Sequence, residues 1–186
     1  MARAPRRPAD SQRGRTRAAA VRAPESTGAA TLDAADRALL AEAIKARECA
    51  HAPWSHFRVG AAARFGRRIV HGCNVEFAVY GLTNCAERTA VFAAHACGAA
   101  RAALSAIAVV ADTPEPVSPC GACRQVMFEC GGPNLRVILA NLRGDVRVLR
   151  IDELLPNGFR LDSEMALASA ARRSAADAAR SRRKPR

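Results

Sequence analysis

Two short stretches decide how this chain folds and works: Asn-Cys-Ala-Glu-Arg at residues 84–88 and Ser-Pro-Cys-Gly-Ala-Cys-Arg-Gln at residues 118–125. In the second stretch Cys120 and Cys123 are three positions apart, a spacing that places both side chains on one face of the first turn of a helix. Backbone N–H groups at a helix N-terminus favour the thiolate form of cysteine over the thiol. The spacing therefore indicates two thiolates that face the same point.

Both stretches also carry the signals of a helix start. Asn84 with Glu87 three residues later fits a capping box, and Ser118 followed by Pro119 fits an N-cap with proline at the first helical position. We therefore expect a helix to begin at each stretch. These start signals account for the polar residues but give the cysteines no role.

Apolar periodicity in the rest of the chain predicts alternating strands and helices after an opening helix and hairpin. The expected helices lie at 32–50, 84–98, 119–130 and, as a short turn, 152–155; the expected strands lie at 58–65, 69–74, 106–111, 136–140 and 146–149. This order predicts an α/β fold of three α/β/α layers with a mixed sheet of about five strands. Sites in such sheets lie where strands end and helices begin, as both cysteine stretches do.

Cys85, Cys120 and Cys123 as thiolates would give a tetrahedral zinc site with one position open, which indicates catalysis. A closed structural zinc is the alternative, with a fourth ligand drawn from Cys73, Cys97, Cys130 or a histidine. Structural sites usually draw their ligands as two close pairs, and Cys85 has no cysteine two or three residues away. Three unrelated core cysteines remain a further alternative.

The net charge of +12 is distributed unevenly along the chain. Residues 1–31 hold seven arginines against two acids, and residues 170–186 hold seven basic residues against one acid, which leaves only +1 for residues 32–169. Because both ends lack an apolar period, we expect disordered basic arms at 1–31 and 170–186 around one folded domain at 32–169.

The composition indicates a cytoplasmic protein with reduced thiols. His95 and Arg101 interrupt the best apolar run, residues 91–111, so no segment reaches the roughly 20 residues of a membrane span. The arginine-rich N-terminus loosely resembles an organelle transit peptide but lacks the apolar centre of a secretory signal. Without such a signal, seven cysteines favour a metal over a disulfide framework.

Taken together, the two cysteine stretches resemble the cytidine deaminase family, in its zinc-dependent form with three cysteines and a nearby glutamate. The resemblance spans about residues 33–165 and includes three further motifs in family order: PWSHFRVGAA at 53–62, GCNVE at 72–76 and YGLT at 80–83. It implies hydrolytic deamination of free cytidine or deoxycytidine to the uridine product and ammonia, as part of pyrimidine salvage.

The resemblance also implies a set of roles around one Zn²⁺ per chain. Cys85, Cys120 and Cys123 would be the ligands, and Glu87 would take a proton from the activated water and pass it to the ring and the leaving ammonia. Three thiolates leave the zinc centre negatively charged, and Arg88 is placed to offset this charge with a hydrogen bond to a ligand sulfur.

For the substrate, the resemblance assigns the sugar 3′-hydroxyl to Asn74 and Glu76, the pyrimidine wall to Phe57 and a contact with the base to the backbone of Ala86. It also implies a homotetramer in which Phe159 enters a neighbouring subunit's site; packing of Phe159 on its own core is the alternative. Three residues depart from the family pattern and leave the preference between ribo- and deoxyribonucleoside open: Trp54, Phe77 and Val79.

Two rival functions follow from the same residues. Deaminases of DNA and RNA typically use histidine as the first ligand and line a groove with basic and aromatic residues, whereas this chain has Cys85 and carries its basic charge at the ends. A non-enzymatic zinc module that binds nucleic acid would have a saturated metal and salt-sensitive binding. The Asn74-x-Glu76 motif favours a free nucleoside over a nucleic acid as the substrate, with no nucleic acid or membrane partner needed.

Overall fold

The computed structural model describes residues 32–160. Within this range five strands form one mixed sheet in the order β2-β1-β3-β4-β5, in which β3 and β4 run parallel and the other neighbouring pairs antiparallel. The strands are β1 (Val59–Phe65), β2 (Arg68–Cys73), β3 (Leu104–Ala111), β4 (Arg136–Asn141) and β5 (Val146–Arg150). The helices are α1 (Ala34–Glu48), α2 (Ala86–Ala96), α3 (Gly121–Gly131) and α4 (Ile151–Leu154), with a 3₁₀ turn, η1, at Tyr80–Leu82.

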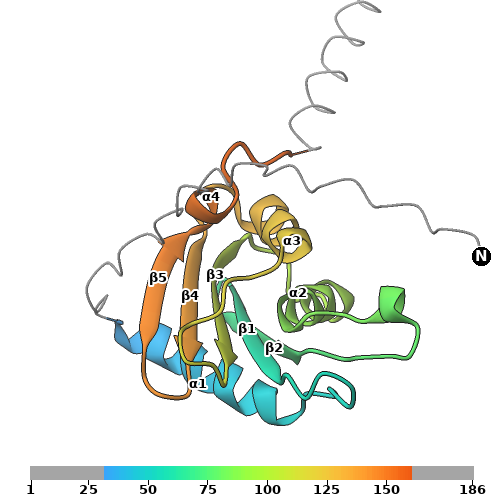
Figure 1. Ribbon diagram of the computed structural model, residues 1–186. Coiled ribbons are helices and arrows are strands. Elements are labelled where there is room, and N and C mark those ends of the chain that lie inside the picture. The colour runs from blue at the N-terminus through green and yellow to red at the C-terminus, as the bar shows by residue number, and fades with distance from the viewer. Residues whose placement is uncertain (1–31, 161–186) are drawn as a thin grey trace, which may run out of the picture.

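The helices cover both faces of the sheet, which gives the three predicted layers (Figure 1). Helix α1 packs on one face, and α2, α3 and α4 pack on the other. Side chains along the central strand β3 alternate accordingly: Ile107 and Val109 join the core under α2 and α3, while Ala108 and Val110 join the core under α1. The predicted α/β fold class with a mixed five-stranded sheet is confirmed.

Two glycines let helices approach the sheet closely, one on each face. A Cβ built on Gly60 would lie 2.1 Å from the carbonyl oxygen of Ala43 in α1, and a Cβ on Gly72 would lie 2.4 Å from the amide nitrogen of Ala90 in α2. No side chain fits at either distance, so these positions fix how near α1 and α2 lie to the sheet.

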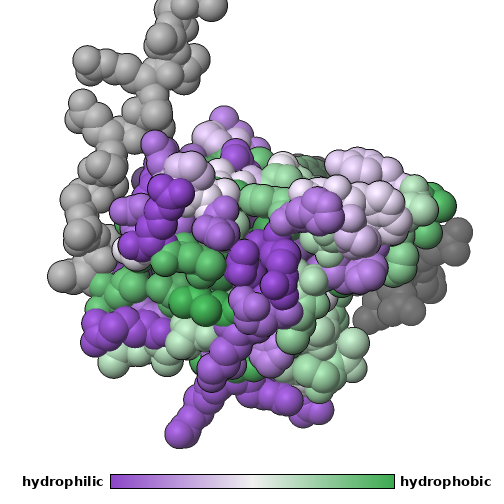
Figure 2. All heavy atoms as spheres, turned by 60° about the horizontal axis from the view of Figure 1, so that its bottom comes forward, coloured by the Kyte–Doolittle hydropathy of each residue, from purple (hydrophilic) through white to green (hydrophobic). Residues whose placement is uncertain are grey.

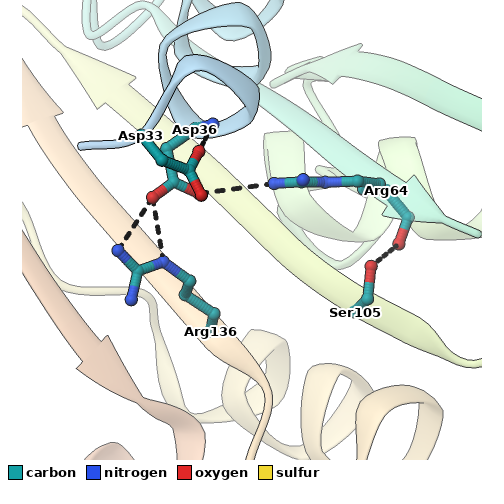
Figure 3. Close-up of polar contacts among 5 residues, drawn as sticks. All are labelled: Asp33, Asp36, Arg64, Ser105 and Arg136. Carbon is teal, nitrogen blue, oxygen red and sulfur yellow. Dashed lines mark hydrogen bonds and ion pairs between the residues drawn. The ribbon is translucent and has the colours of Figure 1, made fainter. Parts of the chain in front are cut away.

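A buried carboxylate ties α1 to the sheet (Figure 3). Asp36 is only 1% exposed and accepts two hydrogen bonds from Arg136, of 3.0 and 2.8 Å, on β4. Arg64 on β1 reaches the other carboxylate oxygen at 3.4 Å, and Asp33 caps the helix by accepting from the Asp36 amide at 2.7 Å. A buried charge with two guanidinium partners orients α1 across the strands.

The face that carries α1 is mixed in character. Figure 2 turns this side forward and shows hydrophilic residues across its middle with hydrophobic residues on both sides of them. Within residues 32–160, no helix is long and apolar enough to cross a membrane. The predicted arms at 1–31 and 170–186, and the end of the predicted domain from 161 to 169, lie outside the described residues.

Candidate active site

Helices α2 and α3 begin at the predicted cysteines, but not through the predicted caps. The N-cap residues are Cys85 and Cys120, and neither makes a side-chain capping hydrogen bond. The expected capping box of Asn84 with Glu87 is therefore wrong, because the side-chain Nδ2 of Asn84 donates to Thr89 Oγ1 at 3.1 Å instead. The expected Ser118 cap is also wrong, since its hydroxyl accepts from Arg124 at 3.0 Å. Thiols stand at both helix starts, where amide groups favour a negative sulfur.

The structure brings the three predicted cysteines together. The Sγ atoms of Cys85, Cys120 and Cys123 all lie within 4.8 Å of one another, and those of Cys85 and Cys120 are 3.8 Å apart. Two sulfurs bound to one tetrahedral zinc at about 2.3 Å would be about 3.8 Å apart, so the donor set fits this metal. Within residues 32–160 no fourth cysteine, histidine or carboxylate joins this cluster, which argues against a closed structural site.

The pKa values of the cluster thiols depend on one another. A hydrogen bond with Cys123 is the main cause that lowers the pKa of the Cys85 thiol to about 5, and the same contact raises the pKa of Cys123. Arg88 contributes as well, because its guanidinium donates to Cys85 Sγ at 3.5 Å. Arg88 therefore lies where it was expected, against a sulfur of the cluster.

Glu87 is the buried carboxyl beside these thiols. It occupies the first turn of α2, two residues after Cys85, and is 4% exposed. Burial raises its pKa, and the negative charge on Cys85 acts in the same direction. A carboxyl whose pKa is raised toward neutrality can both accept and return a proton, as general acid-base catalysis requires.

Backbone pairing places the predicted sugar-binding segment next to the cysteines. Val75 forms a parallel bridge with His51 on one side and an antiparallel bridge with Asn84 on the other. The amide of Val75 donates to the Asn84 carbonyl at 3.0 Å, and the Asn84 amide donates back at 2.9 Å. The residue that precedes Cys85 is thus joined by main-chain hydrogen bonds to the residue between Asn74 and Glu76.

Asn74 is buried and holds the loop that carries Phe57. Its Oδ1 accepts from the Val59 amide at 2.8 Å, and its Nδ2 donates to the Phe57 carbonyl at 2.8 Å. One lone pair and one N–H remain for a ligand. The predicted sugar contact is thus combined with a structural task that the sequence did not reveal.

Glu76 lies at the edge of a pocket of about 250 Å³. Its carboxylate accepts from the amides of Trp54 and Ser55 and from the Ser55 hydroxyl, and the hydroxyl bond is the main cause that lowers its pKa. Trp54 and Phe77, two of the residues expected to bear on substrate preference, line this pocket, together with Ser55, Ala78, Tyr80 and Thr83. The pocket adjoins the predicted sugar-binding residues, and the cysteines and Glu87 are not part of its lining.

Phe159 is 54% exposed, so it does not pack into its own core. Its carbonyl accepts a hydrogen bond of 2.7 Å from Gln125 in α3, which also donates to Glu129 at 2.6 Å. The motif that contains Cys123 therefore positions the Phe159 segment from 34 residues away. Sequence reasoning gave Gln125 no role, and no local signal could have revealed this long-range contact.

Arg124 is a second residue whose task the sequence did not show. Its guanidinium donates to the carbonyls of Pro119 and Leu154 at 2.8 Å each, as well as to Ser118. These bonds connect the loop before Cys120 to helix α4. Arg124, which follows Cys123 in the sequence, thus helps to position the Cys120 thiol.

Three clustered thiols at two helix starts, with a buried carboxyl beside them on an α/β/α sheet, define a zinc hydrolase site of the deaminase class. The family model of the cytidine and deoxycytidylate deaminase zinc-binding region matches residues 33–139. The chain belongs to this family, and zinc is its cofactor. The predicted family resemblance is confirmed.

Individual relatives agree with this assignment. A cytidine deaminase of Halalkalibacterium halodurans is 53% identical over 122 residues, which cover 65% of this chain and 91% of that protein. One from Mycobacterium tuberculosis is 44% identical over 125 residues, 67% of this chain and 89% of that protein. The crystal structure of a cytidine deaminase from Burkholderia pseudomallei superposes with a TM-score of 0.63 at 54% identity, over 66% of this chain and 98% of that one.

Proposed function

We propose that this chain hydrolyses the exocyclic amine of free cytidine, deoxycytidine or both, releasing ammonia and the corresponding uridine. The observation that carries the proposal is the cluster of three thiols within 4.8 Å with the 4%-exposed Glu87 next to it. Relatives named cytidine deaminase, one of them 53% identical, support the same reaction.

In this proposal Cys85, Cys120 and Cys123 hold the zinc. When bound, zinc lowers the pKa of a water ligand and so supplies a nucleophile at neutral pH. The exposed position of Cys120 leaves this side of the cluster open to solvent and substrate. Arg88, within 3.5 Å of Cys85 Sγ, offsets part of the negative charge of three thiolates.

Glu87 is the proton carrier. Its carboxylate accepts one proton from the water and delivers it to the pyrimidine ring nitrogen, then accepts a second proton from the hydroxyl added to the ring and delivers it to the departing amine. The burial that raises its pKa makes the carboxylate a stronger base, so it takes the proton from the water more readily. Water has little access to a side chain that is 4% exposed, which keeps the proton on the reaction path.

Substrate recognition is assigned to the segment that the backbone bridges hold beside Cys85. Asn74 and Glu76 bind the sugar hydroxyl, Phe57 forms a wall of the pyrimidine site, and the Ala86 backbone contacts the base. The lowered pKa of Glu76 supports this role, because an ionised carboxylate is a strong acceptor for a hydroxyl.

We further propose a cytoplasmic homotetramer that acts in pyrimidine salvage, with one Zn²⁺ per chain. The exposure of Phe159, fixed by Gln125 and not packed on its own core, supports a role at a neighbouring subunit's site. The end segments 1–31 and 170–186 are proposed as basic arms outside the catalytic domain, so trimming them should leave zinc content and turnover nearly unchanged.

An ultraviolet assay with cytidine, deoxycytidine and a cytosine-containing oligonucleotide in parallel tests the function. Loss of cytosine absorbance is expected with one or both free nucleosides and not with the oligonucleotide. Turnover of the oligonucleotide alone would refute the proposal in favour of a nucleic-acid deaminase. A protein that binds zinc and polyanions but converts none of the three would be a non-enzymatic module.

A further inference from the structure

A second pair of cysteines lies on the opposite face of the sheet from the zinc cluster. Cys73 ends β2 and pairs in register with Gly60, whose backbone contacts α1, so Cys73 belongs to the α1 side. Cys49 is the C-cap of α1. The Cys73 thiol donates to the Cys49 carbonyl at 3.3 Å, which brings the two residues into direct contact.

Main-chain pairing holds these two residues side by side. The parallel bridge between His51 and Val75 is closed by two hydrogen bonds, from the His51 amide to the Asn74 carbonyl at 3.0 Å and from the Glu76 amide to the His51 carbonyl at 2.8 Å. Cys49 lies two residues before His51, and Cys73 lies two residues before Val75. Both are free thiols; Cys49 is exposed and Cys73 is half-buried.

A polar pocket lies beside this pair. Immediately after Cys49 the chain lines a pocket of about 320 Å³ with His51, His56 and Arg58 among its walls. Guanidinium and imidazole groups complement carboxylates, and glutathione disulfide carries several. The pair therefore combines a solvent-exposed thiol, a half-buried thiol in contact with it, and an adjoining polar pocket whose Arg58 also pairs with Glu48 at 3.4 Å.

We propose that Cys49 and Cys73 form a reversible disulfide that responds to a low-molecular-weight disulfide such as glutathione disulfide. The exposed Cys49 thiolate attacks one sulfur of the oxidant and releases one glutathione thiolate. The Cys73 thiolate then attacks the Cys49 sulfur of this mixed disulfide and releases the second glutathione. Two protein thiols are oxidised and one glutathione disulfide is reduced to two glutathiones.

The disulfide would act on substrate binding through Asn74, which directly follows Cys73. To reach the Cys49 sulfur, the Cys73 side chain must leave the Cys49 carbonyl, and the backbone at Asn74 moves with it. Asn74 holds the Phe57 and Val59 backbone with both ends of its amide, so the loop that carries Phe57 shifts too. This consequence rests on the proposed sugar-binding role of Asn74 and Glu76; the disulfide itself does not.

The test uses the reduced, zinc-loaded full chain treated with glutathione disulfide. Intact-mass measurement should show the loss of two hydrogens per chain with zinc retained, and peptide mapping should join Cys49 to Cys73. Cys49→Ser and Cys73→Ser should abolish the loss, whereas Cys97→Ser, which changes an exposed cysteine elsewhere, should not. Dithiothreitol should reverse it. A parent chain that stays reduced, or a mass loss that persists in Cys49→Ser, would overturn the proposal.

Kinetics then test the link to the sugar-binding loop. Oxidation should raise KM for cytidine about fivefold or more with little change in kcat, and only in chains that keep both cysteines. If the disulfide forms without raising KM, the coupling through Asn74 is refuted. Because mass and mapping need no turnover, failure of the proposed deamination would be seen separately from failure of the disulfide.

Discussion

Replacing Glu87 with glutamine separates a catalytic role from a structural one. Glu87 makes no capping box with Asn84, and it lies in the first turn of α2. Loss of its charge there should cost at most about 1 kcal/mol of folding free energy through the helix dipole. Burial already raises its pKa, so a neutral amide of the same size suits the site and zinc should be retained.

The expected effect on rate is much larger. Removal of a general acid-base typically costs about a hundredfold to ten-thousandfold, or about 3 to 5 kcal/mol of transition-state stabilisation. Because Glu87 serves two proton transfers in the proposed mechanism, we expect the upper part of this range for kcat on cytidine. The assay is absorbance loss under saturating substrate, with zinc measured by atomic emission and stability by urea unfolding.

Two matched variants complete this experiment. Glu42→Gln changes an α1 glutamate that pairs with Lys45 on the other face of the sheet from Cys85, Cys120 and Cys123, and it should leave kcat unchanged. Cys120→Ala removes a proposed ligand, so it should lose zinc and turnover together. A Glu87→Gln protein that holds zinc and deaminates cytidine at nearly the parent rate would refute the mechanism.

Three further predictions follow from the geometry. Gly72→Ala places a methyl 2.4 Å from the Ala90 amide, so it should cost about 1 to 3 kcal/mol of folding free energy and reduce zinc content by displacing α2. Gly60→Ala should cost as much folding free energy by displacing α1, but it should keep its zinc. Equal zinc content in the two variants would contradict this prediction. Phe159→Ala should raise KM for cytidine with kcat preserved, and Gln125→Leu should act in the same direction by freeing the Phe159 carbonyl; a fully active monomer in sedimentation analysis would contradict the shared site. The pKa of Glu76 is below its ordinary value of 4.5, so its proposed contact with the sugar should be complete above pH 4.5 and lost only as pH falls through the lower folded pKa. KM should therefore stay constant from about pH 8 to about pH 5. A rise in KM well above pH 5 that Glu76→Gln abolishes would show that the pKa of Glu76 is raised, not lowered.

Much of the fold was predictable because each element has a distinct apolar period. The continuous apolar run at 106–111 became the central strand β3, and the predicted hairpin became β1 and β2. The 3₁₀ turn at Tyr80–Leu82 was not predicted, because three residues carry no period. The glycine positions that set the helix-to-sheet distances were not identified either, since the helix backbones they meet are distant in sequence.

The site was predictable in composition and less so in detail. The cysteines, Glu87 and Arg88 lie together as expected. The caps were wrong because Asn84 and Ser118 have competing partners, Thr89 and Arg124, and a local pattern does not show which bond forms. Gln125 and the loop-holding task of Asn74 depend on contacts 34 and 15 to 17 residues away, which local spacing does not reveal.

The bridges that join His51, Val75 and Asn84 bear on how this site can change in evolution. They consist of main-chain hydrogen bonds, which form whatever side chains the residues carry. Neighbouring side chains can therefore be exchanged without moving the thiols, those of Trp54 and Phe77 in the adjacent pocket included. The side chains that line the substrate pocket can therefore change without displacing the three zinc ligands.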